Sequence, residues 1–128
     1  MNVKVGSMAR SLTHLVLSAL MAVYAAVFMS TGARAADTVT LTIKNHQFIP
    51  TELIVPAGER FRIEVENQDS TPAEFESTDL RVEKIVVPGG KIMVMAGPLK
   101  PGTYKFFDDY HPDTAYGTIT AAQRKVQE

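Results

Sequence analysis

The chain has 128 residues, and its 13 lysines and arginines against 14 aspartates and glutamates give a formal net charge of −1 at pH 7. This balance argues against a protein that binds nucleic acid or an anionic membrane surface through charge. The chain contains no cysteine, which excludes thiol catalysis, disulfides, thiolate zinc sites and any metal centre that needs a cysteine sulfur.

Residues 1–35 have the pattern of a secretory signal peptide. A basic start precedes a run of 18 residues, Leu12 to Met29, that is almost wholly apolar, and Ala33-Arg34-Ala35 supplies small residues for cleavage. We therefore expect cleavage before Ala36 and a periplasmic mature protein. The apolar run is at the lower limit for a membrane span, so retention as an anchor is the alternative.

Residues 36–128 are expected to form one small domain. Removal of the leader takes three basic residues and no acidic one, so 10 basic and 14 acidic residues remain and the net charge becomes −4. Without disulfides, a domain of this size depends on its apolar core for stability.

Apolar residues of this domain recur at every second position, which is typical of half-buried β-strands. In chain order we expect strands at residues 38–44, 53–55, 60–66, 80–87, 91–95, 104–106 and 119–121. Proline confines residues 53–55 to an edge or a short strand, and Pro88-Gly89-Gly90 predicts a hairpin between the strands on either side of it. No helical stripe longer than about a turn occurs, so the pattern predicts an all-β sandwich with Greek-key order.

The loop before the last strand is dense in side chains that can bind a metal. Asp108, Asp109, His111 and Asp113 fall within six positions, and carboxylates beside an imidazole suit iron, manganese or divalent copper. The alternative is an ordinary turn, because short carboxylates bond to their own backbone and proline fixes φ. The loop alone does not decide between these two interpretations.

Six short motifs, five of which contain proline, glycine or an aromatic residue, are spaced along the domain, at residues 48–50, 55–58, 65–67, 88–89, 101–106 and 117–120. In this order and at this spacing they resemble the cupredoxin family. The resemblance implies a cupredoxin-like Greek-key β-sandwich of about six to eight strands.

Four further segments, at residues 72–77, 81–84, 97–104 and 106–111, narrow the resemblance. They are similar to the cysteine-free periplasmic cupredoxin-like proteins of bacterial iron uptake, such as the amino-terminal domain of EfeO-type proteins. This likeness implies a domain that handles a metal ion for an uptake system.

A blue-copper cupredoxin carries Cys, His and Met in the loop before the last strand. Counting back from Gly117 puts Phe107 at the cysteine position and Ala115 at the methionine position, so the blue-copper set is missing. The resemblance brings the segment around residue 74 to the same end of the fold. It thereby implies an oxygen-rich metal site of Glu74, Glu76, Asp108, Asp109 and His111, which suits ferric iron or divalent copper.

Each further candidate ligand has a plain structural alternative. Glu74 and Glu76 lie on one face of an extended segment, and Arg81 and Lys84 would balance them on a solvated strand face. His46 could reach the same rim as a ligand, or be a lone exposed histidine.

Two methionines in the strand at residues 91–95 also need an explanation. Met93 and Met95 share one face of that strand, where core packing is the default for such a pair. The alternative is that they are soft ligands for copper.

The resemblance implies a periplasmic protein that handles iron and/or copper, with a copper or iron ion as its cofactor. Its partners would be a periplasmic iron-binding protein and an inner-membrane iron permease. It would assist ferrous iron oxidation as an accessory, with no catalytic residue of its own expected. The alternatives are a periplasmic copper carrier that uses Met93, Met95 and His46, and a metal-free β-sandwich interaction module.

Overall fold

The computed structural model describes residues 35–125. These residues contain nine strands and no helix. In chain order the strands are β1 (Asp37–Lys44), β2 (Gln47–Ile49), β3 (Glu52–Pro56), β4 (Phe61–Asn67), β5 (Ala73–Ser77), β6 (Val82–Val86), β7 (Lys91–Ala96), β8 (Gly102–Asp108) and β9 (Tyr116–Ala122).

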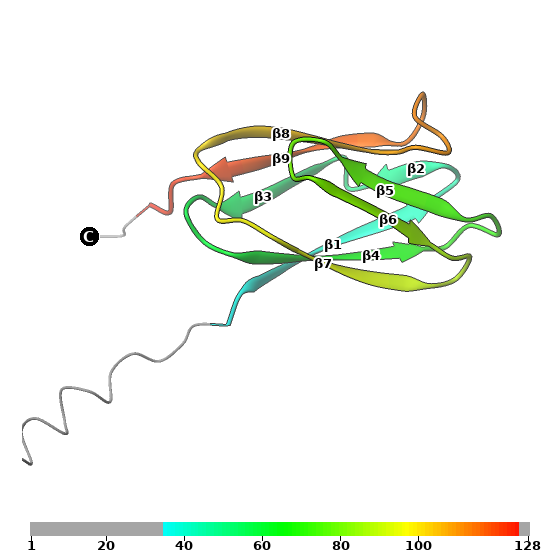
Figure 1. Ribbon diagram of the computed structural model, residues 1–128, viewed down its shortest axis with the longest axis horizontal. Coiled ribbons are helices and arrows are strands. Elements are labelled where there is room, and N and C mark those ends of the chain that lie inside the picture. The colour runs from blue at the N-terminus through cyan, green and yellow to red at the C-terminus, as the bar shows by residue number, and fades with distance from the viewer. Residues whose placement is uncertain (1–34, 126–128) are drawn as a thin grey trace, which may run out of the picture. The chain divides into compact units, whose positions relative to one another are not determined.

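The strands form two sheets that face each other (Figure 1). One sheet has the order β2-β1-β4-β7 and the other has the order β3-β9-β8-β5-β6. Two neighbouring pairs, β1 with β4 and β3 with β9, are parallel, and the remaining pairs are antiparallel. Because β1 and β4 run in the same direction, both end at one end of the sandwich, where Ile43 is opposite Asn67.

The core forms from the alternate residues that each strand turns inward. In β4, Phe61, Ile63 and Val65 are completely buried while the residues between them are not. Phe48, Phe75 and Phe106 pack against one another from both sheets, with ring centroids 5.0 to 6.2 Å apart. Such aromatic contacts contribute beyond simple area burial.

The expected all-β sandwich is confirmed, with nine strands among the described residues instead of six to eight. The edge position expected for residues 53–55 is also confirmed, since β3 is the first strand of its sheet. The expected hairpin around Pro88-Gly89-Gly90 is wrong. β6 pairs with β5 and β7 pairs with β4, so this turn carries the chain from one sheet to the other.

Within residues 35–125 no helix is long and apolar enough to cross a membrane. The leader expected at residues 1–35 lies outside the described residues except for Ala35. Its cleavage therefore stays a prediction.

Candidate functional site

A tight turn between β1 and β2 presents His46 at one end of the sandwich. Lys44 pairs with Gln47, so Asn45 and His46 form a two-residue hairpin loop, and their φ angles are 52° and 54°. A type I′ turn requires positive φ at both positions, and asparagine and histidine are among the residues that adopt it more often than other non-glycine residues. The backbone N–H groups of Asn45 and His46 donate to the Asp69 carboxylate at 2.7 and 2.9 Å. These bonds help to hold the turn.

The surroundings of Asp69 favour its ionised form. Its partial burial raises its pKa, but the hydrogen bonds from the backbone of His46 and Asn45 and the nearby imidazoles of His46 and His111 outweigh that effect. The net result is a pKa below the usual value. One oxygen of the same carboxylate also lies 3.5 Å from Nδ1 of His46.

Asp108 holds the second histidine. The side chain of Asp108 is fully buried at the end of β8. Its Oδ1 accepts hydrogen bonds from the backbone N–H of Glu74 at 2.8 Å and of Tyr110 at 3.0 Å, and its Oδ2 lies 3.1 Å from Nδ1 of His111. The bond to Tyr110 is the local turn contact that short carboxylates favour. Asp108 therefore shapes the loop and contacts a candidate ligand at the same time.

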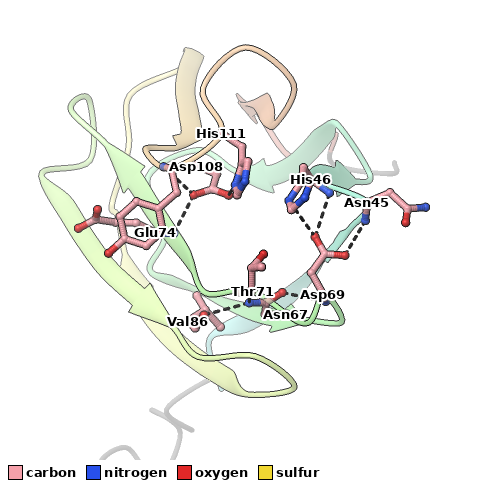
Figure 2. Close-up of polar contacts among 10 residues, drawn as sticks. Asn45, His46, Asn67, Asp69, Thr71, Glu74, Val86, Asp108 and His111 are labelled. Atoms are coloured by element: carbon pink, nitrogen blue, oxygen red, sulfur yellow. Dashed lines mark hydrogen bonds and ion pairs between the residues drawn. The ribbon is translucent and has the colours of Figure 1, made fainter.

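The two imidazoles lie against each other. The rings of His46 and His111 are stacked, with centroids 3.8 Å apart and planes inclined by 19°. Figure 2 shows this imidazole pair with Asp69 and Asp108 beside it. Each ring has its Nδ1 edge at a carboxylate, and both rings are partly exposed, at 44% for His46 and 30% for His111. Sequence reasoning proposed both histidines separately, and the fold brings them together.

Asn67 links the loop that carries Asp69 to both sheets. Its side-chain amide is buried and donates to the backbone carbonyls of Thr71 and Val86, while its Oδ1 accepts from the backbone N–H of Asp69. Since every buried polar group here has a partner, the loop that carries Asp69 is fixed to β6.

Three of the predicted ligands lie elsewhere. Glu74 and Glu76 occupy alternate positions of β5, whose other face carries the buried Ala73, Phe75 and Ser77. With Glu83 and Asp109 they form a group that we call the carboxylate face. Burial, Glu83 and Asp109 raise the pKa of Glu74, and burial, Asp109 and Glu83 raise that of Glu76. Burial and then Glu74 also raise the pKa of Tyr110.

The alternative in which Arg81 and Lys84 balance the charges of Glu74 and Glu76 is not supported. In residues 35–125 no ion pair joins these groups. Glu76 is directly opposite Glu83 on β6, and like charges in that position destabilise a sheet.

Met93 and Met95 are not core residues, contrary to the default interpretation of this pair. Their side chains are 42% and 52% exposed on the outer face of β7. Opposite them in β4 are Glu64 and Arg62, so no histidine is their direct cross-strand neighbour.

The residues present do not fit a blue-copper centre, because the chain has no cysteine. The count from Gly117 puts Phe107 at the cysteine position. Phe106 and Asp108 are buried, whereas Phe107 between them is half-buried beside Lys105 and Tyr116. The inward position of this loop is therefore held by Asp108.

Across residues 35–125 no group of three or more His, Cys, Asp or Glu side chains is placed so that it could hold a metal ion as it stands. The imidazole pair itself supplies two nitrogen donors, which suit copper, zinc, nickel or iron. The structure thus divides the six predicted ligands into the imidazole pair, the buried Asp108 between the two groups, and the carboxylate face.

Sequence reasoning missed Asp69 and Asn67. A polar run after a buried strand, Asn67-Gln68-Asp69-Ser70, is the available signal, but it also fits any loop. Only the parallel pairing of β1 with β4 shows that this run lies beside the Asn45-His46 turn.

Comparisons with known proteins agree with this architecture. Residues 17–121 match the family described as Cupredoxin-like domain. An uncharacterised protein of Rickettsia prowazekii (strain Madrid E) is 48% identical over 81 residues, which are 63% of this chain and 65% of that protein. The match thus spans less than two thirds of the relative's length.

Solved structures share the fold at low sequence identity. Auracyanin A, a "blue" copper protein from Chloroflexus aurantiacus, gives a TM-score of 0.60 at 14% identity, covering 69% of this chain and all of that one. A purple cupredoxin from Nitrosopumilus maritimus gives 0.54 at 20% identity, covering 66% and 99%. Amicyanin from Paracoccus versutus gives 0.54 at 15% identity, covering 70% and 86%. The chain therefore belongs to the family of proteins with a cupredoxin-like domain.

Proposed function

We propose that this protein is a metal-binding cupredoxin-like protein whose imidazole pair supplies the ligands. The observation that carries the proposal is the stacked contact of His46 and His111, each with its Nδ1 edge at a carboxylate. Histidines that ligate metals commonly have a carboxylate at their second ring nitrogen. The solved structures with this fold include a "blue" copper protein, which supports copper as one candidate ion.

A titration of the metal-free protein with cupric, zinc and ferric ions tests this function. His46→Ala and His111→Ala are each expected to weaken binding of cupric ion at least tenfold and to leave the fold intact, because both rings are partly exposed. Asp113→Asn, in the same loop and exposed, is the matched control. Equal affinities in both histidine variants and the wild type would move the site elsewhere.

The colour of the cupric complex gives an independent check. With imidazole and oxygen ligands and no thiolate, it should be pale, with the paramagnetic signature of nitrogen and oxygen donors. An intensely blue complex of the monomer would contradict this ligand set.

The carboxylate face is a second candidate for a metal. Glu76 and Glu83 are directly opposite each other, and neighbouring carboxylates raise the pKa values of Glu74 and Glu76. A hard cation such as ferric iron would relieve this repulsion. Glu76→Gln and Asp109→Asn should weaken ferric binding and leave cupric binding unchanged if the two sites are separate.

The biological role that we propose is the handling of iron and/or copper for an iron uptake system. Its partners would be a periplasmic iron-binding protein and an inner-membrane iron permease, and it would assist ferrous iron oxidation. This role follows from the resemblance to the iron-uptake subgroup. This role is tested by measuring the uptake of labelled ferrous iron in cells that lack the protein and in cells that carry His111→Ala.

The proposed location is the periplasm, after cleavage before Ala36. Amino-terminal sequencing of the protein released from the periplasm should begin near that residue. Recovery only from membranes with Leu12 to Met29 intact would favour an anchor.

Adding cuprous ion to these titrations distinguishes two alternatives. A copper carrier would bind cuprous ion and lose affinity in the Met93→Leu, Met95→Leu variant. A metal-free interaction module would bind none of these ions tightly.

A further inference from the structure

The carboxylates beside the imidazole pair are already occupied by backbone donors. Both backbone partners of Asp108, the N–H groups of Glu74 and Tyr110, bond to its Oδ1, which leaves its Oδ2 facing Nδ1 of His111. The side chain is completely buried. If Asp108 turned toward a metal as a direct ligand, the N–H groups of Glu74 and Tyr110 would lose their acceptor, which is unfavourable.

Asp69, in the loop that follows β4 of the other sheet, also accepts hydrogen bonds from backbone N–H groups. Its Oδ1 accepts from the backbone of Asn45 at 2.7 Å, and its Oδ2 accepts from the backbone of His46 at 2.9 Å and lies 3.5 Å from Nδ1 of that ring. Its own N–H is bonded to Asn67. Each imidazole therefore faces a carboxylate whose position is set by backbone groups.

An ionised carboxylate can only accept hydrogen bonds. The ring nitrogen that faces it must carry the proton, so a neutral imidazole in this position has its lone pair on Nε2. This reasoning needs no metal, and it rests on a hydrogen-bond contact of 3.1 Å for His111 and on a longer ion-pair contact of 3.5 Å for His46.

We propose that Asp69 and Asp108 are positioning residues and not ligands, and that they make Nε2 of His46 and Nε2 of His111 the ligating atoms. With two imidazole nitrogens as its protein donors, the site suits divalent ions that favour imidazole, such as Cu²⁺ and Zn²⁺. This assignment deepens the proposed function and rests on it for the ligating role of Nε2. The tautomer assignment is independent of that function.

The ring stack adds a condition for binding. The lone pair of an imidazole nitrogen lies in the ring plane, and a zinc–nitrogen bond is about 2.0–2.1 Å long. Two rings stacked 3.8 Å apart and nearly parallel have almost no point that lies in both planes at that distance. One ion bound by both rings must therefore turn them out of the stack while the Nδ1 contacts hold their other edge.

Long-range proton–nitrogen correlation spectra of the metal-free, nitrogen-15-labelled protein at about pH 8, above the ordinary histidine titration range, test the tautomers. We expect both rings to carry the proton on Nδ1. Asp108→Asn can donate from its amide and should shift His111 toward the Nε2–H form, with His46 unchanged. Asp69→Asn should shift His46 toward the Nε2–H form, with His111 unchanged. Asp113→Asn should change neither ring.

Zinc titration of the same samples tests the ligating atoms. Zinc should shift the Nε2 signals of both rings, and Asp108→Asn should lower zinc affinity about 10- to 100-fold, as expected for loss of an outer partner. If Asp108→Asn disturbs the fold, Asp69→Asn gives the same comparison from the other sheet.

The outcomes separate the two ideas. A proton on Nε2 in the wild type, or tautomers that ignore both substitutions, would overturn the positioning roles even if zinc binds. Expected tautomers with no zinc response would support the positioning roles and overturn the ligating role of Nε2, and failure of the cupric titration as well would overturn the proposed function. A zinc-induced shift at Nδ1 would overturn the assignment of the ligating atoms.

Discussion

At the scale of single residues, the two carboxylates beside the imidazole pair are mainly acceptors of backbone hydrogen bonds. Asp69 accepts the two N–H groups of the Asn45-His46 turn, and Asp108 accepts the N–H groups of Glu74 and Tyr110. Only after these bonds are made does each carboxylate reach an imidazole. A positive φ at His46 is the local cost of presenting its ring at the rim.

The two histidines and Asp108 could be suggested from residue type and position, whereas Asp69 could not. His111 lies in a loop with three aspartates, which is a visible signal. Asp69 lies in an ordinary polar loop, and its contact with His46 depends on a parallel pairing of β1 and β4 that alternation alone does not reveal. The choice of which carboxylates contact imidazole and which face outward also depends on this three-dimensional arrangement.

Asp69 should contribute to stability in a pH-dependent way. Its folded pKa is lowered, so its stabilising effect is fully present above the usual aspartate pKa and is lost as pH falls through the folded pKa. Urea unfolding of metal-free wild type and Asp69→Asn from pH 7 to pH 3 should give a difference in unfolding free energy that shrinks on acidification. A difference that grows toward low pH would contradict this, and exposed Asp113→Asn should show none.

At the scale of elements, the recurrence of apolar residues at every second position located most strands but did not indicate which strands pair with each other. The runs at residues 38–44 and 60–66 correspond to β1 and β4. The Pro88-Gly89-Gly90 turn has the composition of a hairpin loop, but it joins strands of different sheets. Pairing depends on which faces meet in the core, and that is a property of the whole sandwich.

β5 and β6 carry a repulsive contact that a single substitution should relieve. Burial, Asp109 and Glu83 raise the pKa of Glu76. For a carboxyl with a raised folded pKa, the unfavourable effect of its charge is present above that pKa and disappears as pH falls below the usual value. Glu76→Gln should therefore be more stable than the wild type at pH 7 and equally stable near pH 4, as measured by urea unfolding.

Glu64→Gln is the matched control for this substitution. Its carboxylate also lies on an outward strand face, but it is 3.4 Å from Nζ of Lys91. Removing that charge should bring no gain at pH 7, because it removes an attraction. A gain of the same size in both variants would show that net charge, and not the local repulsion, is the cause.

The pairing of β8 with β9 depends on a glycine. A Cβ at Gly117 would lie 2.4 Å from the Phe106 ring and 2.5 Å from the Thr51 carbonyl oxygen. Gly117→Ala should lower the unfolding free energy by about 1–3 kcal/mol or more, because the ring or the backbone must shift. Thermal melts would measure this, with exposed Thr103→Ala on β8 as the control. An unchanged melting temperature would mean that Phe106 can move aside freely.

At the scale of the whole molecule, the cupredoxin-like sandwich is kept while the sulfur ligand is absent from the sequence. The turn at one end, the loop between β8 and β9, and the end of β4 each bring one part of the site (Figure 1). These parts are held by both sheets, so an ion that binds the imidazole pair connects the two layers. With no disulfide in the chain, such a connection should have a visible effect on global stability.

Metal binding should therefore stabilise the folded domain by mass action. An ion that binds only the folded state adds about 2.7 kcal/mol at 100 times its dissociation constant, and for a domain of this size each kcal/mol raises the melting temperature by about 4–8 °C. Titration with Zn²⁺ to that concentration should raise the melting temperature of the wild type by at least about 10 °C. His46→Ala and His111→Ala should lose most of this rise, whereas Asp113→Asn should keep it. A full rise in both histidine variants that disappears in Glu76→Gln would place the ion on the carboxylate face instead.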